Sequence, residues 1–268
     1  MERKIYTHVN VDLDAACSVW AVRNFVPGFS SAEVEFVHAN WDGKELNDKD
    51  IAVDLEAGIK GRKDGTTRSA FATIVARYAD EEDQKALENL VQYVDAQDSY
   101  GSAVEYFIPN VDERTKEVFS SNGINTVLRA LQAQYRDDKV VLMFGEILDG
   151  LYKMGLSKIR AIKEAEWVGP VALIYGAKEF GTNGELFKRG AKAIVYIDGY
   201  NIGVIKASTV EARMDHPYIR NVIGSEGWFF HPAGFMAAWG SRKSPATTPS
   251  RVDPKRLAEV VAQVVGGE

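Results

Sequence analysis

Apolar positions in the first half of the chain alternate between strand-like and helix-like spacing. Residues 4–11 and 33–38 are β-prone, and residues 51–54 form a short apolar run that ends in an acid. Between the first two runs, residues 15–26 have a helical pattern that a Pro-Gly pair ends. Strands that alternate with helices predict a parallel sheet, so we expect an α/β fold.

Two further amphipathic helices are expected before residue 100. The first follows a polar segment in which Thr66 or Thr67 is a candidate N-cap, and the second covers about residues 82–98. Each places four apolar residues on one face: Phe71, Ile74, Val75 and Tyr78 in the first, and Leu87, Leu90, Val91 and Val94 in the second.

The second half begins with a long helical pattern over about residues 138–166, which we interpret as a helix that links two domains. A strand over 170–175 and a loop and helix over 180–189 follow. Two strands around Asp198-Gly199-Tyr200-Asn201 then predict a hairpin, and a final helix is expected over 254–265.

These elements predict three parts of the chain. A parallel-sheet N-terminal domain occupies residues 1–137, a linker helix 138–167, and a smaller mixed α/β domain 168–268. The first 137 residues carry 15 Lys and Arg against 24 Asp and Glu, a net charge of −9, whereas the remainder has a net charge of +3. Such an asymmetry fits a cation site in the first domain and an anion-binding second domain, although chance surface variation gives the same pattern.

Composition excludes several classes of protein. The 268 residues are 46% hydrophobic and 26% charged, which is ordinary for a globular protein. No apolar run is long enough for a membrane helix, and the N-terminus lacks the apolar region of a secretory signal. The single cysteine, Cys17, excludes an internal disulfide and a cysteine-cluster zinc site. We therefore expect a soluble, cytoplasmic protein.

The strongest chemical signal follows the first strand, where His8 is followed by Asp12 and Asp14; Asp54 ends the next core strand in the same way. Ligand sites of α/β proteins form at the carboxyl ends of parallel strands, and imidazole with carboxylates suits a divalent metal. The alternative for any one acid is a helix cap, and Asp14 is a candidate N-cap for the helix from Ala15. For the four residues together we favour a metal site.

Asp95 and Asp98 lie three residues apart at the end of a predicted helix, where they share a face. Acids at a helix C-terminus oppose the helix dipole, so their presence indicates either metal ligation or a helix that ends earlier.

These motifs resemble the DHH phosphoesterase superfamily, which includes RecJ-type exonucleases, oligoribonucleases and manganese pyrophosphatases. The segment from His8 through Asp12 and Asp14 to Ser18 resembles the first motif, and residues 51–54 resemble the second. Residues 94–98 resemble the fourth, with Asp95 the favoured ligand. The resemblance implies that His8, Asp12 and Asp54 bind one metal, while Asp14, Asp54 and Asp95 bind a second. The implied cofactor is Mn²⁺, or alternatively Mg²⁺.

The resemblance extends to the second half of the chain. Residues 171–208 are similar to the opening sheet of the associated DHHA1 substrate domain, and residues 227–235 to its glycine- and histidine-containing loop. It implies substrate binding by His231 and Gly234, and the following Arg242 and Lys243 are suited to phosphate. The alternative is a tight turn followed by an exposed basic segment.

The Asp-His-His motif that names the superfamily is not preserved. The segment after Asp54 contains no histidine, and Lys63-Asp64-Gly65 occupies the corresponding place. One metal site is therefore complete in sequence, whereas the second lacks its histidine. We consider that a cation such as Lys63 or Arg68 replaces the missing metal and stabilises a phosphoryl oxygen; the alternative is a solvated basic loop.

The first interpretation is a metal-dependent, exonuclease-like phosphoesterase. Asp12, Asp14, Asp54 and Arg68 form its expected catalytic set, and the cleft between the domains is expected to take the substrate. That substrate is a short single-stranded oligonucleotide, a nucleotide or a small phosphorylated molecule. The second is a binding protein on the same fold that retains metal or nucleotide binding without hydrolysis. A dehalogenase-type phosphatase ranks last, because Ala15-Ala16 replaces the Gly-Thr expected after its Asp-x-Asp. A homodimer is compatible with any of these.

Overall fold

In the computed structural model, which describes residues 3–61, 69–176, 181–224 and 226–267, the first sheet has three parallel strands. The central strand is β1 (Lys4–His8), flanked by β2 (Glu33–Val37) and β3 (Ile51–Ala52). All three carboxyl ends therefore lie at one edge of the sheet. This arrangement confirms the parallel sheet predicted from the alternation of strands and helices.

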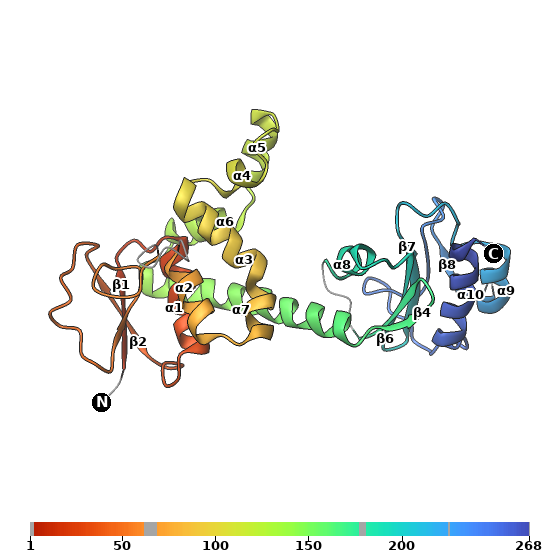
Figure 1. Cartoon of the computed structure of the whole chain (residues 1–268), viewed down its shortest axis with the longest axis horizontal. Helices are drawn as coiled ribbons and strands as arrows, with labels where there is room; N and C mark the ends of the chain where they lie inside the picture. The colour runs from red at the N-terminus through yellow and green to blue at the C-terminus, as the bar shows by residue number, and fades with distance from the viewer. Residues whose placement is uncertain (1–2, 62–68, 177–180, 225, 268) are drawn as a thin grey trace. The chain divides into compact units, whose positions relative to one another are not determined.

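The chain divides into two compact units, Met1–Lys153 and Met154–Glu268. Helices make up most of the first unit, and α7 continues from it into the second (Figure 1). These helices are α1 (Leu13–Phe25), α2 (Ala70–Tyr78), α3 (Glu81–Tyr100), α4 (Ala103–Phe107), α5 (Glu113–Ser120), α6 (Ile124–Gln132) and α7 (Asp137–Lys163).

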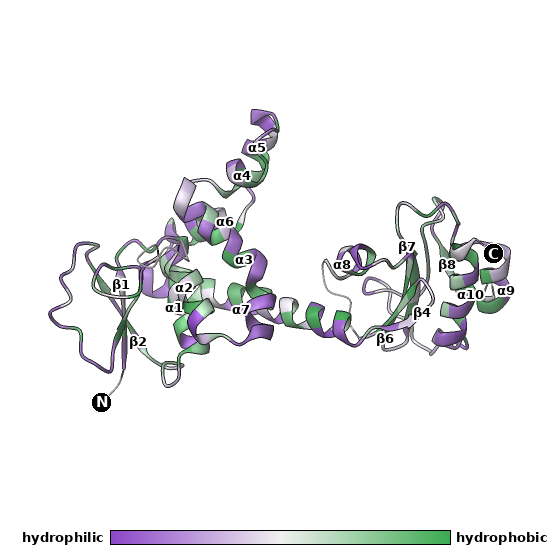
Figure 2. Cartoon of the chain, in the orientation of Figure 1, coloured by the Kyte–Doolittle hydropathy of each residue, from purple (hydrophilic) through white to green (hydrophobic). Residues whose placement is uncertain are grey.

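Helix α1 forms the centre of the first core. Its residues from Leu13 to Val22 are all buried, and α2, α3 and α7 contribute residues to the same cluster. Figure 2 shows hydrophobic residues gathered along α1 and on the neighbouring part of α7. The indole Nε1 of Trp20 donates to Asp149 Oδ1 at 2.7 Å, which ties α1 to α7.

Local sequence rules predicted the main helices but not every boundary. The N-cap of α2 is Ser69, whose side chain accepts from the backbone N–H of Ala72; Thr66 and Thr67 lie outside the described residues. Residues 103–132 contain α4, α5 and α6, for which no elements were predicted. No residue of α5 is buried, so this helix does not contribute an apolar face to the core of the described structure.

The second unit is built on a mixed sheet of six strands in the order β4-β5-β6-β7-β9-β8. Among the described strands of this sheet, only β5 and β6 pair in parallel, and β6 and β7 form the predicted hairpin at Gly199, whose φ is +59°. The strands are β4 (Glu166–Val168), β5 (Val171–Tyr175), β6 (Ala193–Asp198), β7 (Asn201–Lys206), β8 (Phe229–Phe230) and β9 (Met236–Trp239).

Helices cover this second sheet through two hydrophobic clusters. Residues of α9 (Pro217–Ile223) and α10 (Pro254–Gly266) pack in the larger cluster, and Leu186 of α8 (Thr182–Lys188) packs in the smaller one. The predicted fold class is confirmed: a parallel α/β unit is joined by a long helix to a smaller mixed α/β unit. None of the described helices is long and apolar enough to cross a membrane.

Replacement of Phe144 in α7 by Ala tests whether this part of the linker helix belongs to the first core. Phe144 is fully buried, so Phe144→Ala is expected to lower the free energy of unfolding by about 3–5 kcal/mol. Leu142 on the same helix is 59% exposed, and Leu142→Ala is expected to change it by less than about 0.5 kcal/mol. Urea unfolding followed by tryptophan fluorescence gives both values. Equal effects of the two variants on the free energy of unfolding would contradict the burial of Phe144 in the first core.

Candidate metal centre and adjoining cavity

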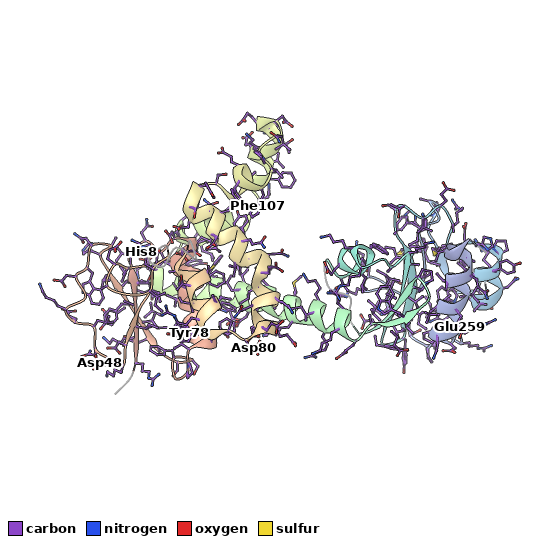
Figure 3. The ribbon with its side chains drawn as sticks, in the orientation of Figure 1. His8, Asp48, Tyr78, Asp80, Phe107 and Glu259 are labelled. Atoms are coloured by element: carbon purple, nitrogen blue, oxygen red, sulfur yellow. The ribbon has the colours of Figure 1, made fainter. Side chains whose placement is uncertain are left out.

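The carboxyl ends of β1 and β3 bring three potential metal ligands together. His8 is the last residue of β1, and Asp54 lies two residues beyond β3. His8 Nε2 lies 3.2 Å from Asp54 Oδ2 and 3.8 Å from Asp12 Oδ1. One ligand atom from each residue lies within 4.8 Å of the other two. Figure 3 labels His8 at this edge of the sheet and Asp48 in the loop before β3.

The backbone has an unusual conformation just beyond the ends of both β1 and β3. Asn10, with φ of 57°, and Asp54, with φ of 51°, are the non-glycine residues with positive φ in the described chain. Asn and Asp tolerate this left-handed conformation better than other side chains, yet each such residue still has an energetic cost. Asn10 lies between the candidate ligands His8 and Asp12, and Asp54 is itself a candidate ligand, so the strained backbone belongs to the site, as is common at functional sites.

Neighbouring groups stabilise these two turns. The carboxylate of Asp137, at the start of α7, accepts from the backbone N–H groups of Asn10 at 2.7 Å and Val11 at 3.2 Å. After Asp54 the chain turns back, and Gly58 packs so closely that an added Cβ would lie 2.1 Å from the carbonyl oxygen of Ala52. Only glycine is compatible with that approach, so the turn is constrained at its start by the positive φ of Asp54 and at its end by the contact of Gly58 with β3.

The ring of His8 is oriented through both nitrogens. Nδ1 lies 3.0 Å from the carbonyl oxygen of Val9, which can only accept, so Nδ1 carries a proton. Nε2 faces the Asp54 carboxylate. Hydrogen bonding to Asp54 raises the pKa of His8 to about 9, with the Val9 carbonyl and the Asp12 carboxylate acting in the same direction against partial burial. The Nε2 position therefore requires a cation, either a proton or a metal.

Asp14 is buried and does not cap its own helix. Helix α1 begins at Leu13, and its N-cap is Asp12, whose Oδ1 accepts from the N–H of Ala15 at 3.0 Å. The two Asp14 oxygens instead accept from the N–H groups of Ala70 and Phe71, both at 2.8 Å, at the start of α2. Burial and the nearby Asp54 carboxylate raise the pKa of Asp14 well above its ordinary value, and these two hydrogen bonds oppose the shift.

Asp95 also contacts the start of α2. Its Oδ1 accepts from the backbone N–H of Ser69 at 2.9 Å and from the Ser69 hydroxyl at 2.5 Å. Asp95 and Asp98 both lie in the last turns of α3, which ends at Tyr100, so neither is placed beyond the helix. Asp95 and Asp14 thus bind the first residues of one helix, and both carboxylates retain lone pairs for another partner.

The other predicted site residues are not part of this cluster as described. Lys63 and Arg68 lie outside the described residues. His231, Gly234, Arg242 and Lys243 belong to the second unit. There His231 Nδ1 accepts from the N–H of Ala233 at 3.1 Å, and Gly234 has φ of 71°. Arg242 and Lys243 are exposed in the segment after β9. Their roles in substrate binding stay predictions.

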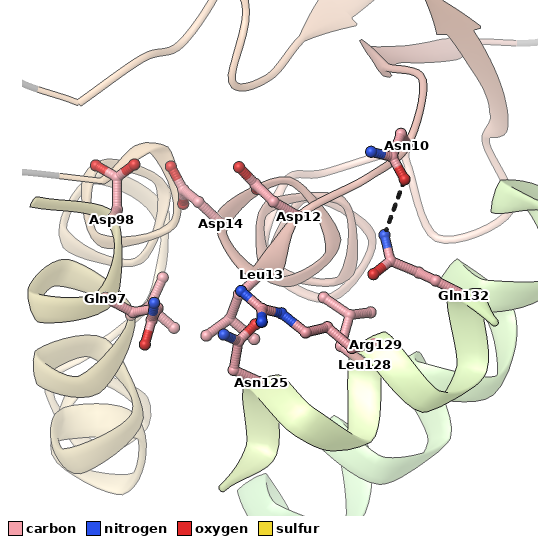
Figure 4. A pocket seen from close by; sticks show the side chains of 11 residues that line it. Asn10, Asp12, Leu13, Asp14, Gln97, Asp98, Asn125, Leu128, Arg129 and Gln132 are labelled. Carbon is pink, nitrogen blue, oxygen red and sulfur yellow. Dashed lines mark hydrogen bonds between the residues drawn. The ribbon is translucent and has the colours of Figure 1, made fainter. Parts of the chain in front are cut away.

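A polar cavity of about 330 Å³ adjoins the candidate metal centre within the first unit. Asp12 and Asp14 belong to its wall, and α3 and α6 supply most of the remainder (Figure 4). Its polar lining residues that sequence reasoning missed are Asn10, Gln97, Asn125, Arg129 and Gln132. The signal was present in part: Ile124, Leu128 and Leu131 have helical spacing, and Asn125, Arg129 and Gln132 follow each of them by one residue.

No protein-family model and no curated protein matches this sequence. Among solved structures, the chain is similar to RecJ from Thermus thermophilus in complex with Mn²⁺, with a TM-score of 0.30 and 9% identity over 98% of this chain. It spans 52% of that protein. An exonuclease RecJ bound to manganese gives a TM-score of 0.30 and 10% identity, with 98% of this chain and 89% of that one covered. An uncharacterized protein from Helicobacter pylori G27 gives a TM-score of 0.26 and 8% identity, with 99% of this chain and 100% of that one covered.

These similarities are low, so they carry no argument about function.

The charge state of His8 is directly measurable in the metal-free protein. We expect a pKa of about 9 for the His8 ring, and Asp54→Asn is expected to lower it toward the ordinary 6.5, because a neutral amide replaces the carboxylate. NMR titration of the histidine ring signals gives the values, with His8→Gln identifying the resonance. Asp48→Asn, in the loop before β3, is the matched control. A His8 pKa near 6.5 in the wild-type protein would contradict the described hydrogen bond.

Proposed function

We propose that this protein is a divalent-metal-dependent phosphoesterase and that Mn²⁺ is its metal. The observation that carries the proposal is the convergence of His8, Asp12 and Asp54 within 4.8 Å at the carboxyl edge of a parallel sheet. Phosphodiesters and small phosphorylated molecules are the proposed substrates.

The donor set fits such a metal. One imidazole nitrogen and two carboxylates suit Mn²⁺, and Mg²⁺ is the alternative that prefers oxygen ligands. His8 is oriented by the hydrogen bond from Nδ1 to the Val9 carbonyl, the type of second contact that metal-binding histidines usually have. His8 Nε2 and Asp54 Oδ2 already lie 3.2 Å apart, so these two donor atoms are close enough to share one cation.

The charges of the described residues also favour a cation here. Burial raises the pKa of both Asp12 and Asp14, and the Asp54 carboxylate acts on both in the same direction. Within the described ranges, His8 is the base that forms ion pairs with Asp12 and Asp54. Lys60 is influenced by the Asp54 charge but pairs with Glu56 at 2.7 Å. A divalent cation would balance this excess of negative charge.

Asp14, Asp54 and Asp95 are the proposed ligands of a second metal. Asp14 and Asp95 each keep free lone pairs while they bind the start of α2, so the helix orients both carboxylates. The histidine expected at this site is absent from the sequence between Asp54 and Ser69. Lys63 or Arg68 is the proposed substitute for that charge.

His8, Asp12 and Asp54 would hold the metal, which would supply Lewis-acid chemistry to a phosphoryl group and to water. The chain's own residues orient that chemistry: His8 and Asp54 fix the position of the charge, and Asp12 remains more than half exposed toward solvent and substrate. A second candidate is a protein that binds the same ligands without hydrolysis. The missing histidine is the observation that favours it.

Conservative amides at the ligand positions test the proposal. Asp12→Asn and Asp54→Asn keep the side-chain volume but remove the charge, so each is expected to weaken Mn²⁺ binding by about a hundredfold or more. Isothermal titration calorimetry measures the affinity, and hydrolysis of bis(4-nitrophenyl) phosphate measures turnover, which both variants are expected to lose. Asp48→Asn is the control and is expected to match the wild type. Full manganese-dependent activity in either ligand variant would mean that the site is misplaced.

Metal binding is expected to depend on pH through His8. Its pKa of about 9 means that a proton occupies Nε2 at neutral pH and must leave before a metal binds. The apparent Mn²⁺ affinity is therefore expected to rise about tenfold per pH unit between about pH 6 and 8. In Asp54→Asn the dependence flattens over the upper part of this range, because the pKa of His8 falls. An affinity for the wild-type protein that stays constant over the same range would exclude His8 as a ligand.

A further inference from the structure

The cavity beside the candidate metal centre has two chemically different sides. Asp12 and Asp14 lie on one side with Asp98, and the polar residues of α6 lie opposite them (Figure 4). The volume of about 330 Å³ is at the lower end of the range for small-molecule sites. A group attached to a phosphate at the metal centre would therefore enter a small, polar space.

Several polar residues of the lining already have partners within the protein. Gln132 Nε2 donates to the Val11 carbonyl at 2.7 Å and to Asn10 Oδ1 at 3.4 Å. Gln97 Nε2 donates to the Gly101 carbonyl, and its Oε1 accepts from the N–H of Ala103 at 3.3 Å. These side chains stabilise the loop before α1 and the end of α3, so they are largely committed to the fold.

In contrast to these glutamines, the side chains of Asn125 and Arg129 are available to a ligand. Neither side chain has a hydrogen-bond or ion-pair partner among the described residues, although both line the cavity. They lie four residues apart on α6, one turn along the same face of the helix. Figure 4 shows the Arg129 side chain extended along the wall toward Asn125. The pair presents a guanidinium and an amide as donors, a combination that binds carboxylate or phosphate oxygens.

The lining also excludes one mode of recognition. Among the described residues it contains no aromatic side chain: its apolar members are Leu13, Val94 and Leu128. A nucleobase held by stacking would need an aromatic face. The exposed rings of Tyr106 and Phe107 border a different hollow, beside Asp95. The donors of this cavity therefore fit a small anionic group better than a base.

We infer that Asn125 and Arg129 form an anion subsite for a second negatively charged group of the substrate, so that the substrate class is a small phosphorylated compound with a further carboxylate or phosphate. This inference rests on the proposed function, because the metal centre would bind the first phosphate. A bound metal would place a cation on one side of the cavity, and Arg129 places a guanidinium on the other, so that each could bind one anionic group of the substrate. Without Arg129, the metal would be the cation left to bind the substrate in this cavity.

Non-hydrolysable phosphonates test the subsite without interference from turnover. The Mn²⁺-loaded protein of 268 residues is titrated by calorimetry with phosphonoacetate, 3-phosphonopropionate and 4-phosphonobutyrate, and with the alkylphosphonates of the same chain length. A comparison of methylenediphosphonate with methylphosphonate tests whether a second phosphoryl group also increases the affinity. We expect at least one compound with the second anion to bind about tenfold or more tightly than its uncharged counterpart.

Arg129→Gln is expected to remove that advantage while the affinity for the alkylphosphonates is unchanged, and Arg129→Lys to restore part of it. Asn125→Ala is expected to reduce the advantage without abolishing it. Arg114→Gln, which changes an arginine of α5 outside the cavity, is the matched control and is expected to leave the advantage intact.

The outcomes separate this inference from the proposed function. If alkylphosphonates bind the manganese-loaded protein but no second anion adds affinity, or if Arg129→Gln leaves the added affinity unchanged, the subsite is wrong and the metal centre stands. If neither Mn²⁺ nor any phosphonate binds, the proposed function fails, and the inference fails with it. An advantage that Arg129→Gln removes supports both.

Discussion

The pairing of β1 with β3 is the constraint on which the candidate site depends. Parallel register places Tyr6 beside Ala52, so that two residues later His8 and Asp54 lie side by side. Immediately beyond, both chains turn through residues with positive φ, at Asn10 and Asp54. These turns are anchored from outside the sheet, by Asp137 at the start of α7 and by the close approach of Gly58 to β3. The ligands therefore converge because of backbone structure that is stabilised some distance from them.

Most of the acids at this edge have a structural contact as well as a proposed chemical role. Asp12 caps α1, a contact that typically contributes about 1 kcal/mol, while the same side chain remains largely exposed to a metal or substrate. Asp14 and Asp95 bind the first residues of α2. The two explanations first considered for these acids, helix capping and metal ligation, are thus compatible, because a carboxylate has more lone pairs than one hydrogen bond uses.

Much of this arrangement could be predicted from the sequence, since it depends on short-range pattern and on strand topology. The proximity of His8 to Asp54 follows from two apolar runs that end in polar residues and pair in parallel. The N-cap role considered as an alternative for Asp14 falls to Asp12 instead, because a local rule considers only the residue's own helix, and the groups that Asp14 binds lie 56 and 57 residues away. Only the folded chain brings them together.

The cavity beside α6 was not predicted for a related reason. No helix was predicted over these nine residues, although Ile124, Leu128 and Leu131 have helical spacing, and such a local pattern does not show which other elements face the helix. Arg129 is exposed, and nothing in the sequence distinguishes it from other surface arginines. Arg129 is a candidate binding residue because it lies across a cavity from Asp12 and Asp14, and that position is a property of tertiary structure.

The most direct test of the central claim is crystallographic. Crystals soaked in MnCl₂ and measured at the manganese absorption edge show where the ion binds through anomalous difference density. A peak is expected between His8 Nε2 and the carboxylates of Asp12 and Asp54, at about 2.0–2.3 Å from each ligand atom. Density for manganese elsewhere on the protein, with His8 still bonded to Asp54, would contradict it.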